Sequence, residues 1–137
     1  FSEKNVKKIP WLYLTFNPKK IETVPAHRMI TVRDLLSHSS GIEQGLAGMI
    51  MMMKMRYKDD TLETRARNYT THPLDFHPGT AAGYSPLAGF DILARIIEIV
   101  SANTFDTFLR ENIFNQLAMK DATFHPSEVQ WKRITKL

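Results

Sequence analysis

The strongest candidate for a catalytic side chain is Tyr84, which lies in the run FHPGTAAGYSP over residues 76–86. An isolated tyrosine, with a hydroxyl pKa of about 10, is a poor base at neutral pH. A lysine ammonium beside it would favour the phenolate, whose oxygen could take a proton from a serine hydroxyl and return it to a leaving group. Tyr84 is therefore the leading catalytic candidate. The alternative interpretation is a half-buried tyrosine whose hydroxyl caps the helix that follows.

The neighbours of this tyrosine predict a loop of restricted shape that leads into a helix. Pro78 and Gly79 form a typical turn dipeptide, and Gly83 allows a backbone angle that other residues avoid. Ser85 is a good N-cap, and Pro86 suits the first position of a helix. The Ser85 hydroxyl could instead contribute to a substrate pocket, but N-capping explains it as well and is the preferred interpretation.

Apolar residues at three- and four-residue spacing predict that this helix covers residues 86–100 and buries one face. The predicted buried stripe consists of Leu87, Phe90, Leu93, Ile96, Ile97 and Val100. The N-terminus of such a helix would present Tyr84 at the rim of the folded core.

Capping signals predict a second helix, well upstream of the tyrosine loop. Thr31 is its N-cap, Asp34 completes a weakened capping box, and Val32, Leu35 and Leu36 supply its apolar face. Gly41 would end this helix as its C-terminal cap. The methionine-rich run over residues 49–55 follows, and it is interpreted as a buried helix or a loop, or alternatively as an adaptable lip over a substrate cleft.

Two further helices are predicted, so the chain is expected to be mainly helical. A capping box at residues 60–63 begins a helix that ends near Tyr69, since Pro73 forbids its continuation. Thr104 caps another helix over residues 105–113. The first 25 residues are expected to be extended or irregular, and the end of the chain turn-like with a strand around residues 122–124. No hairpin signature is present.

Composition excludes several classes of protein. Eighteen basic against fourteen acidic residues is too small an excess to indicate nucleic-acid binding. Without cysteine or a His-x-x-x-His pair, no metal site or cofactor is expected. No apolar run approaches the roughly 20 residues that a membrane span needs, and the N-terminus does not resemble a signal peptide. The compartment stays open.

Several ordered blocks of the sequence resemble the serine beta-lactamase family, in its class C, esterase and penicillin-binding-protein branch. Residues 30–42 are similar to the family's T-x-R-x-L-L-x-H-x-S-G segment. Residues 78–85, 90–98 and 113–124 follow in the family's order. The resemblance implies that Tyr84 is the catalytic tyrosine of a Tyr-x-Asn motif, and that His38 belongs to a structural block. An extracytoplasmic location is compatible with the family.

Two of the family's motifs do not occur in these 137 residues. The nucleophile of the family lies in a Ser-x-x-Lys motif, which is found nowhere in the sequence, and no Lys-Thr-Gly or His-x-Gly strand follows Met119. Pro86 stands where many members have asparagine, so a side-chain contact to a substrate amide is lost. This departure favours an esterase-like or peptidase-like member over an efficient beta-lactamase.

The sequence therefore predicts the helical subdomain of a beta-lactamase/transpeptidase-like α/β fold. We expect one domain over residues 1–137, an internal fragment of a larger hydrolase, with an irregular arm at 1–30, a helical core at 31–125 and a tail at 126–137. Its partners would be a small-molecule or peptide substrate and the rest of the parent hydrolase, and the fragment alone is expected to be inactive. The alternative is a non-catalytic binding or DNA-binding module, since residues 31–50 superficially resemble a helix-turn-helix.

Overall fold

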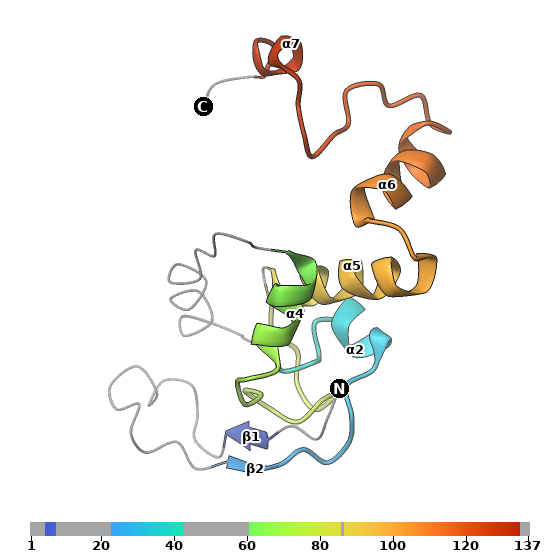
Figure 1. Cartoon of the computed structure of the whole chain (residues 1–137). Coiled ribbons are helices and arrows are strands. Elements are labelled where there is room, and N and C mark those ends of the chain that lie inside the picture. Colours follow the sequence, from blue (N-terminus) through green and yellow to red (C-terminus); the bar gives the residue numbers. More distant parts are fainter. Residues whose placement is uncertain (1–4, 8–22, 43–60, 86, 135–137) are drawn as a thin grey trace. The chain divides into compact units, whose positions relative to one another are not determined.

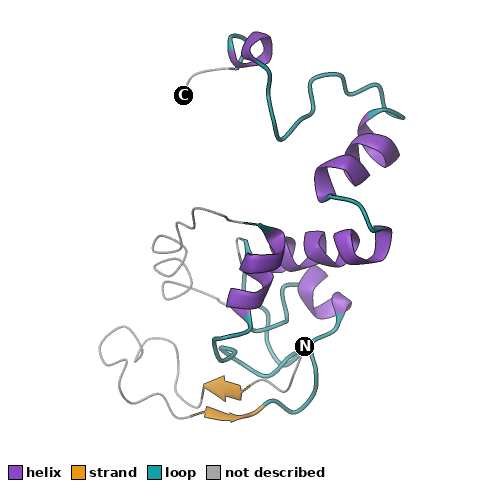
Figure 2. Cartoon of the chain, viewed as in Figure 1, coloured by secondary structure: helices purple, strands orange, loops and turns teal. Residues whose placement is uncertain are grey.

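A computed structural model describes residues 5–7, 23–42, 61–85 and 87–134, and the chain is mainly helical (Figures 1 and 2). The helices are α2 (Val32–Leu36), α4 (Leu62–Tyr69), α5 (Ala88–Ser101), α6 (Phe105–Leu109) and α7 (Glu128–Trp131), with a π-helical turn η2 (Arg110–Phe114) directly after α6. Strands β1 (Asn5–Lys7) and β2 (Thr23–Pro25) pair antiparallel. The methionine run over residues 49–55 lies outside the described residues. So do residues 43–50 of the segment that superficially resembles a helix-turn-helix.

The chain divides into two compact units, residues 1–95 and 96–137. The first unit holds the core, in which side chains from α2, α4, α5 and the loops between them are withdrawn from solvent. Its most buried apolar residues are Leu35, Ile42, Tyr69, Leu74, Ala88, Ile92 and Ala94. The second unit contains α6, η2 and α7, and none of their described residues is buried.

Helices α4 and α5 lie side by side (Figure 1), and polar side-chain contacts join them. The Tyr69 hydroxyl donates to the Asp91 carboxylate at 2.8 Å, and Arg95 reaches Glu63 at 3.1 Å. On another side of α5, a Cβ added to Gly89 would lie only 3.6 Å from the carbonyl oxygen of Leu35 in α2. A methyl group at Gly89 would therefore make an ordinary contact with α2.

Local capping chemistry explains where three of the helices begin. Thr31 accepts from the Asp34 amide while the Asp34 carboxylate accepts from the Thr31 amide, so the predicted capping box is formed. Thr104 caps α6, as predicted. The N-cap of α4 is Thr61, one residue later than predicted, and Thr64 is its partner in place of Glu63.

Three predicted features of the first unit are wrong, and one pair of strands leaves no signal in the sequence. Helix α5 begins at Ala88, and the Ser85 hydroxyl bonds to no described residue, so Ser85 is not its N-cap. Helix α2 ends before Gly41, at Leu36. Gly83 does not adopt a positive φ. Strands β1 and β2 pair despite the absence of a hairpin signature, because strands so far apart in sequence leave no local turn signal.

The predicted buried stripe of α5 is also wrong. Phe90 and Val100 are 53% and 81% exposed, whereas Ile92, which was left out of the stripe, is 1% exposed. The helix has apolar residues on more than one face, and the face that is withdrawn from solvent contains Ala88 and Ile92. In the second unit, the expected strand at residues 122–124 is absent and the predicted tail contains α7.

Candidate active site

The two sequence blocks around His38 and Tyr84 lie side by side and are joined by backbone hydrogen bonds. The Gly83 amide donates to the His38 carbonyl at 2.9 Å, and the Gly79 amide donates to the Ser39 carbonyl at 2.8 Å. A third bond runs from the Asp75 amide to the Gly41 carbonyl at 2.8 Å. Residues 75–83 therefore follow residues 38–41 closely, and the position of the tyrosine loop depends on that segment.

Two glycines make this close approach possible. Gly41 and Gly79 have φ angles of 76° and 80°, in the left-handed region where side chains are disfavoured. A Cβ at Gly41 would collide with the carbonyl oxygen of Phe76, and one at Gly79 would collide with the Arg28 guanidinium. The predicted turn at Gly79 is present, and its glycine also makes room for an arginine side chain.

The Asp34 carboxylate lies next to the tyrosine loop and accepts hydrogen bonds from three residues around it. It is 4% exposed and receives two hydrogen bonds from the Arg28 guanidinium, at 2.7 and 2.8 Å. The Thr31 amide and hydroxyl donate to the same carboxylate at 2.8 and 2.7 Å, and the Ser39 hydroxyl donates at 3.3 Å. The bonds from Arg28 hold the pKa of Asp34 well below its usual range, so the group stays ionised.

Residues preceding Arg28 contact the loop at a second point. The rings of His27 and His77 are stacked, with centroids 3.5 Å apart and planes 10° from parallel. The His27 amide donates to Nδ1 of His77 at 3.3 Å, which requires that this nitrogen carry no proton. Residues 27 and 28 thus lie against the segment 77–79, His27 through the ring stack with His77 and Arg28 through its guanidinium beside Gly79.

Tyr84 projects from the end of this supported loop with 66% of its surface exposed. Its ring lies against that of His38, with centroids 5.0 Å apart and planes inclined by 55°. Its hydroxyl makes no hydrogen bond to any described residue. The Tyr84 hydroxyl therefore does not cap any described residue of the helix that follows. A phenol oxygen left open in this way is available to a reacting group.

Ser85 differs from its neighbour in being almost completely withdrawn from solvent. It is 2% exposed, and its hydroxyl oxygen has no partner among the described residues. Buried hydroxyls nearly always find a partner, so an unpaired one requires an explanation. A contact between Ser85 and a substrate stays a prediction.

The residues that could form a triad by type do not form one. Asp34 bonds to Arg28 and Thr31, and Ser39 donates to Asp34. Nδ1 of His38 is buried and bonds to no described residue, so no relay links Asp34, His38 and a serine. Within the described residues, no group of three or more potential metal ligands is present.

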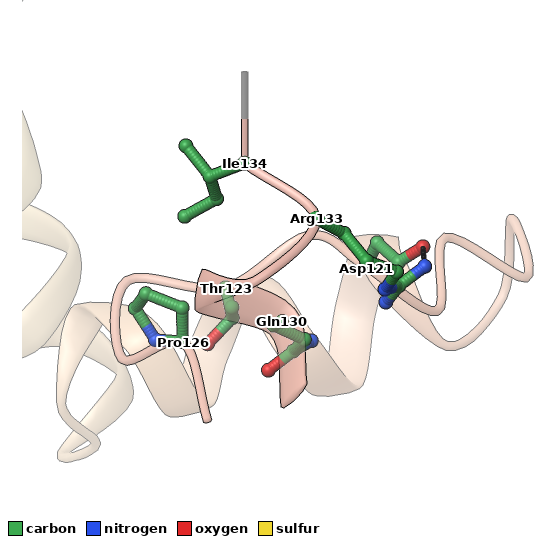
Figure 3. A pocket seen from close by; sticks show the side chains of 6 residues that line it. All are labelled: Asp121, Thr123, Pro126, Gln130, Arg133 and Ile134. Carbon is green, nitrogen blue, oxygen red and sulfur yellow. Dashed lines mark hydrogen bonds and ion pairs between the residues drawn. The ribbon is translucent and has the colours of Figure 1, made fainter. Parts of the chain in front are cut away.

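A shallow pocket of about 230 Å³ lies in the second unit and contains none of the predicted site residues (Figure 3). It is lined by Asp121, Thr123, Pro126, Gln130, Arg133 and Ile134. Its one charged pair is internally satisfied, because Arg133 donates to Asp121 at 3.0 Å through Nη1. Across the described residues, no helix has the length and apolar character to cross a membrane.

Sequence reasoning did not identify Arg28 or the ring contact of His38. Arg28 is a lone basic residue six positions before its partner, a spacing that belongs to no regular element. The signal that was available is Asp34, whose capping role already predicts a buried carboxylate and therefore a cation nearby.

A sequence model of the family described as Beta-lactamase matches residues 11–137. The chain is 34% identical over 105 residues to the lovastatin esterase of Penicillium rubens, covering 74% of this chain and 26% of the relative. It is 32% identical over 105 residues to the D-alanyl-D-alanine-carboxypeptidase/endopeptidase AmpH of Escherichia coli, covering 77% and 27%.

A third relative is named as a penicillin-binding protein. Penicillin-binding protein 4 of Amycolatopsis lactamdurans is 32% identical over 101 residues, which cover 74% of this chain and 25% of the relative. The chain therefore spans about a quarter of the length of the curated relatives that it matches.

Proposed function

Because this chain belongs to the beta-lactamase family of hydrolases, we propose that it is the helical part of a serine hydrolase in which Tyr84 moves the proton. The hydrolase would cleave ester, peptide or beta-lactam bonds through an acyl-enzyme. A serine and a lysine outside these 137 residues would supply the nucleophile and the cation, as the family resemblance implies.

In the proposed reaction, the serine hydroxyl attacks the carbonyl carbon while the Tyr84 phenolate accepts the hydroxyl proton. The C–O or C–N bond to the leaving group then breaks, and the proton passes from Tyr84 to the departing atom. In the second half, water attacks the acyl carbon and gives a proton to Tyr84; the bond between the acyl carbon and the serine oxygen then breaks, and Tyr84 passes that proton to the serine oxygen as the acid leaves. Tyr84 thus returns to its starting state after each turnover.

The observation that carries this proposal is the combination of a fixed loop and an open hydroxyl at Tyr84. The loop is held by backbone bonds from Gly79 and Gly83, while the tyrosine at its end is 66% exposed. General-base catalysis requires this combination, since the base must be positioned and yet free to meet its proton.

Ester and peptide bonds are the favoured substrates. Pro86 removes the amide side chain that many family members place two residues after the tyrosine. The names of the relatives, which include an esterase and a carboxypeptidase, support the same choice. Ser85 stays a candidate contact for the substrate within this proposal, because its buried hydroxyl makes no hydrogen bond to any described residue and could make one to a substrate.

Tyr84→Phe in a hydrolase that contains this chain tests the proposal. The variant keeps the ring and removes the proton carrier, so kcat for a short-chain p-nitrophenyl ester should fall about 10²- to 10⁴-fold. The melting temperature should stay unchanged, because the deleted hydroxyl is unbonded to the described residues. Retention of more than about a third of the activity would contradict a catalytic role for Tyr84.

A further inference from the structure

Helix α2 ends in a Schellman motif whose left-handed position is occupied by a histidine. The Ser39 amide donates to the Asp34 carbonyl at 2.8 Å, and the His38 amide donates to the Leu35 carbonyl at 3.3 Å. His38 itself has a φ of 53°. This position usually holds glycine, because a side chain there brings its Cβ close to the following carbonyl oxygen.

The second unit contains the same motif without an aromatic ring. There the Met119 amide donates to the Phe114 carbonyl at 2.8 Å, the Ala118 amide donates to the Asn115 carbonyl at 3.2 Å, and Ala118 has a φ of 53°. A methyl side chain is therefore enough to complete the motif in this chain. The imidazole of His38 requires a separate explanation.

The surroundings of the His38 ring supply that explanation. The ring lies 5.0 Å from the Tyr84 ring and meets the Phe90 ring nearly edge-on, at 5.8 Å and 72°. The His38 carbonyl also accepts the amide of Gly83, the residue before the tyrosine. One residue in a disfavoured backbone conformation thus contacts the tyrosine through its ring and the preceding residue through its backbone.

We propose that His38 is a positioning residue for Tyr84. Its imidazole holds the tyrosine ring in one orientation, so that the hydroxyl meets the reacting serine without any hydrogen bond from the described chain. The inference rests on the proposed catalytic role of Tyr84. Misplacing a catalytic group by about 1 Å can cost about 100-fold in rate, so a ring contact of this kind is sufficient to control turnover.

The positioning itself can be measured in the 137-residue chain, independently of catalysis. Tyrosines labelled with ¹³C in the ring give NMR signals, and Tyr84→Phe identifies the signal of Tyr84. In His38→Gly this signal should shift toward that of unstructured tyrosine and its order parameter should drop, although the glycine relieves backbone strain. His38→Asn, which also tolerates the left-handed conformation, should behave in the same way.

Ala118→Gly is the matched control, since it places glycine at the same point of the same motif without removing a ring. It should leave the Tyr84 signal unchanged. An unchanged Tyr84 signal in His38→Gly and His38→Asn would overturn the proposal, and so would an equal shift in Ala118→Gly.

Turnover in the hydrolase that contains this chain provides the second readout. His38→Gly should lower kcat by up to about 100-fold with little change in KM, and adding it to Tyr84→Phe should cause no further loss. Losses that multiply in the double variant would show that His38 acts independently of Tyr84 and would overturn the proposal. If Tyr84→Phe alone stays active, the catalytic assignment fails, and the NMR result still decides whether His38 orients the ring.

Discussion

Arg28 and Asp34 form a bidentate ion pair next to the tyrosine loop. The Arg28 guanidinium also occupies the space that a side chain at Gly79 would need. The pair links the end of β2 to the start of α2 and to the loop that holds Tyr84. A change in the charge of Asp34 is therefore expected to affect the loop as well as the helix cap.

Asp34→Asn should destabilise the chain and reduce the dependence of its stability on pH. Loss of the charge-assisted hydrogen bonds should cost about 1.5 to 3 kcal/mol at pH 7. The pKa of Asp34 is lowered on folding, so the wild-type carboxylate contributes its full stabilisation above an unfolded pKa of about 3.9 and loses it progressively as pH falls below that value. Urea unfolding measured from pH 7 to pH 2 should show a smaller decline for Asp34→Asn.

Asp121→Asn is the control for this prediction. Asp121 also pairs with an arginine, but its side chain is 64% exposed and solvent screens the pair. Its removal should change the unfolding free energy much less than that of Asp34. Equal effects of the two substitutions would show that burial of the Arg28–Asp34 pair is not what makes it stabilising.

Gly41→Ala should disturb the contact between residues 38–41 and the tyrosine loop. The added methyl group would meet the Phe76 carbonyl and would also force alanine into a left-handed conformation, which together should cost at least about 1 to 3 kcal/mol. Gly89→Ala is the comparison, because its methyl group would make an ordinary contact at 3.6 Å inside α5.

Thermal unfolding followed by circular dichroism can rank the two variants. Gly89→Ala should be neutral or stabilising by up to about 1 kcal/mol, since alanine is the better helix former. A Gly41→Ala protein with the wild-type melting temperature would refute the close approach of Phe76.

Two isoleucines of α5 provide a direct test of which helix face is packed. Ile92 is 1% exposed, so Ile92→Ala should cost about 2 to 5 kcal/mol in urea unfolding. Ile99 is 64% exposed in the same helix, and Ile99→Ala should change stability by less than about 0.5 kcal/mol. Equal losses would place both residues in the core and contradict the exposure of Ile99.

The buried stripe predicted for α5 illustrates which features the sequence could predict and which it could not. Thr31 and Thr104 were correctly identified as caps because capping is decided within one helical turn. The buried face of α5 was not, because several faces of that helix are apolar and which of them is covered depends on residues distant in sequence. Periodicity identifies a helix but cannot choose between two apolar faces without knowledge of the partner.

The candidate site was predictable to the same extent. Tyr84 was proposed from its loop and its catalytic role stays a prediction, whereas the turn at Gly79 is local chemistry and is present. The left-handed position at the end of α2 was assigned to Gly41 because glycine is the usual residue there. The structure places it at His38, a choice that depends on where the tyrosine loop runs and therefore on contacts between distant residues.

The last prediction concerns the 137-residue chain by itself. It should form no covalent adduct with chromogenic cephalosporins or short-chain p-nitrophenyl esters, because it has no Ser-x-x-Lys motif to supply a nucleophile beside a lysine. Ser37 and Ser39 flank His38 in the sequence, but the Ser37 hydroxyl donates to the Arg33 carbonyl and the Ser39 hydroxyl donates to Asp34, so neither is activated by the imidazole. Intact-mass spectrometry after incubation should therefore show the unmodified mass. A stoichiometric acyl adduct that disappears in a serine-to-alanine variant would locate the nucleophile within this chain, and Tyr84 would then need a different proton donor from the one proposed.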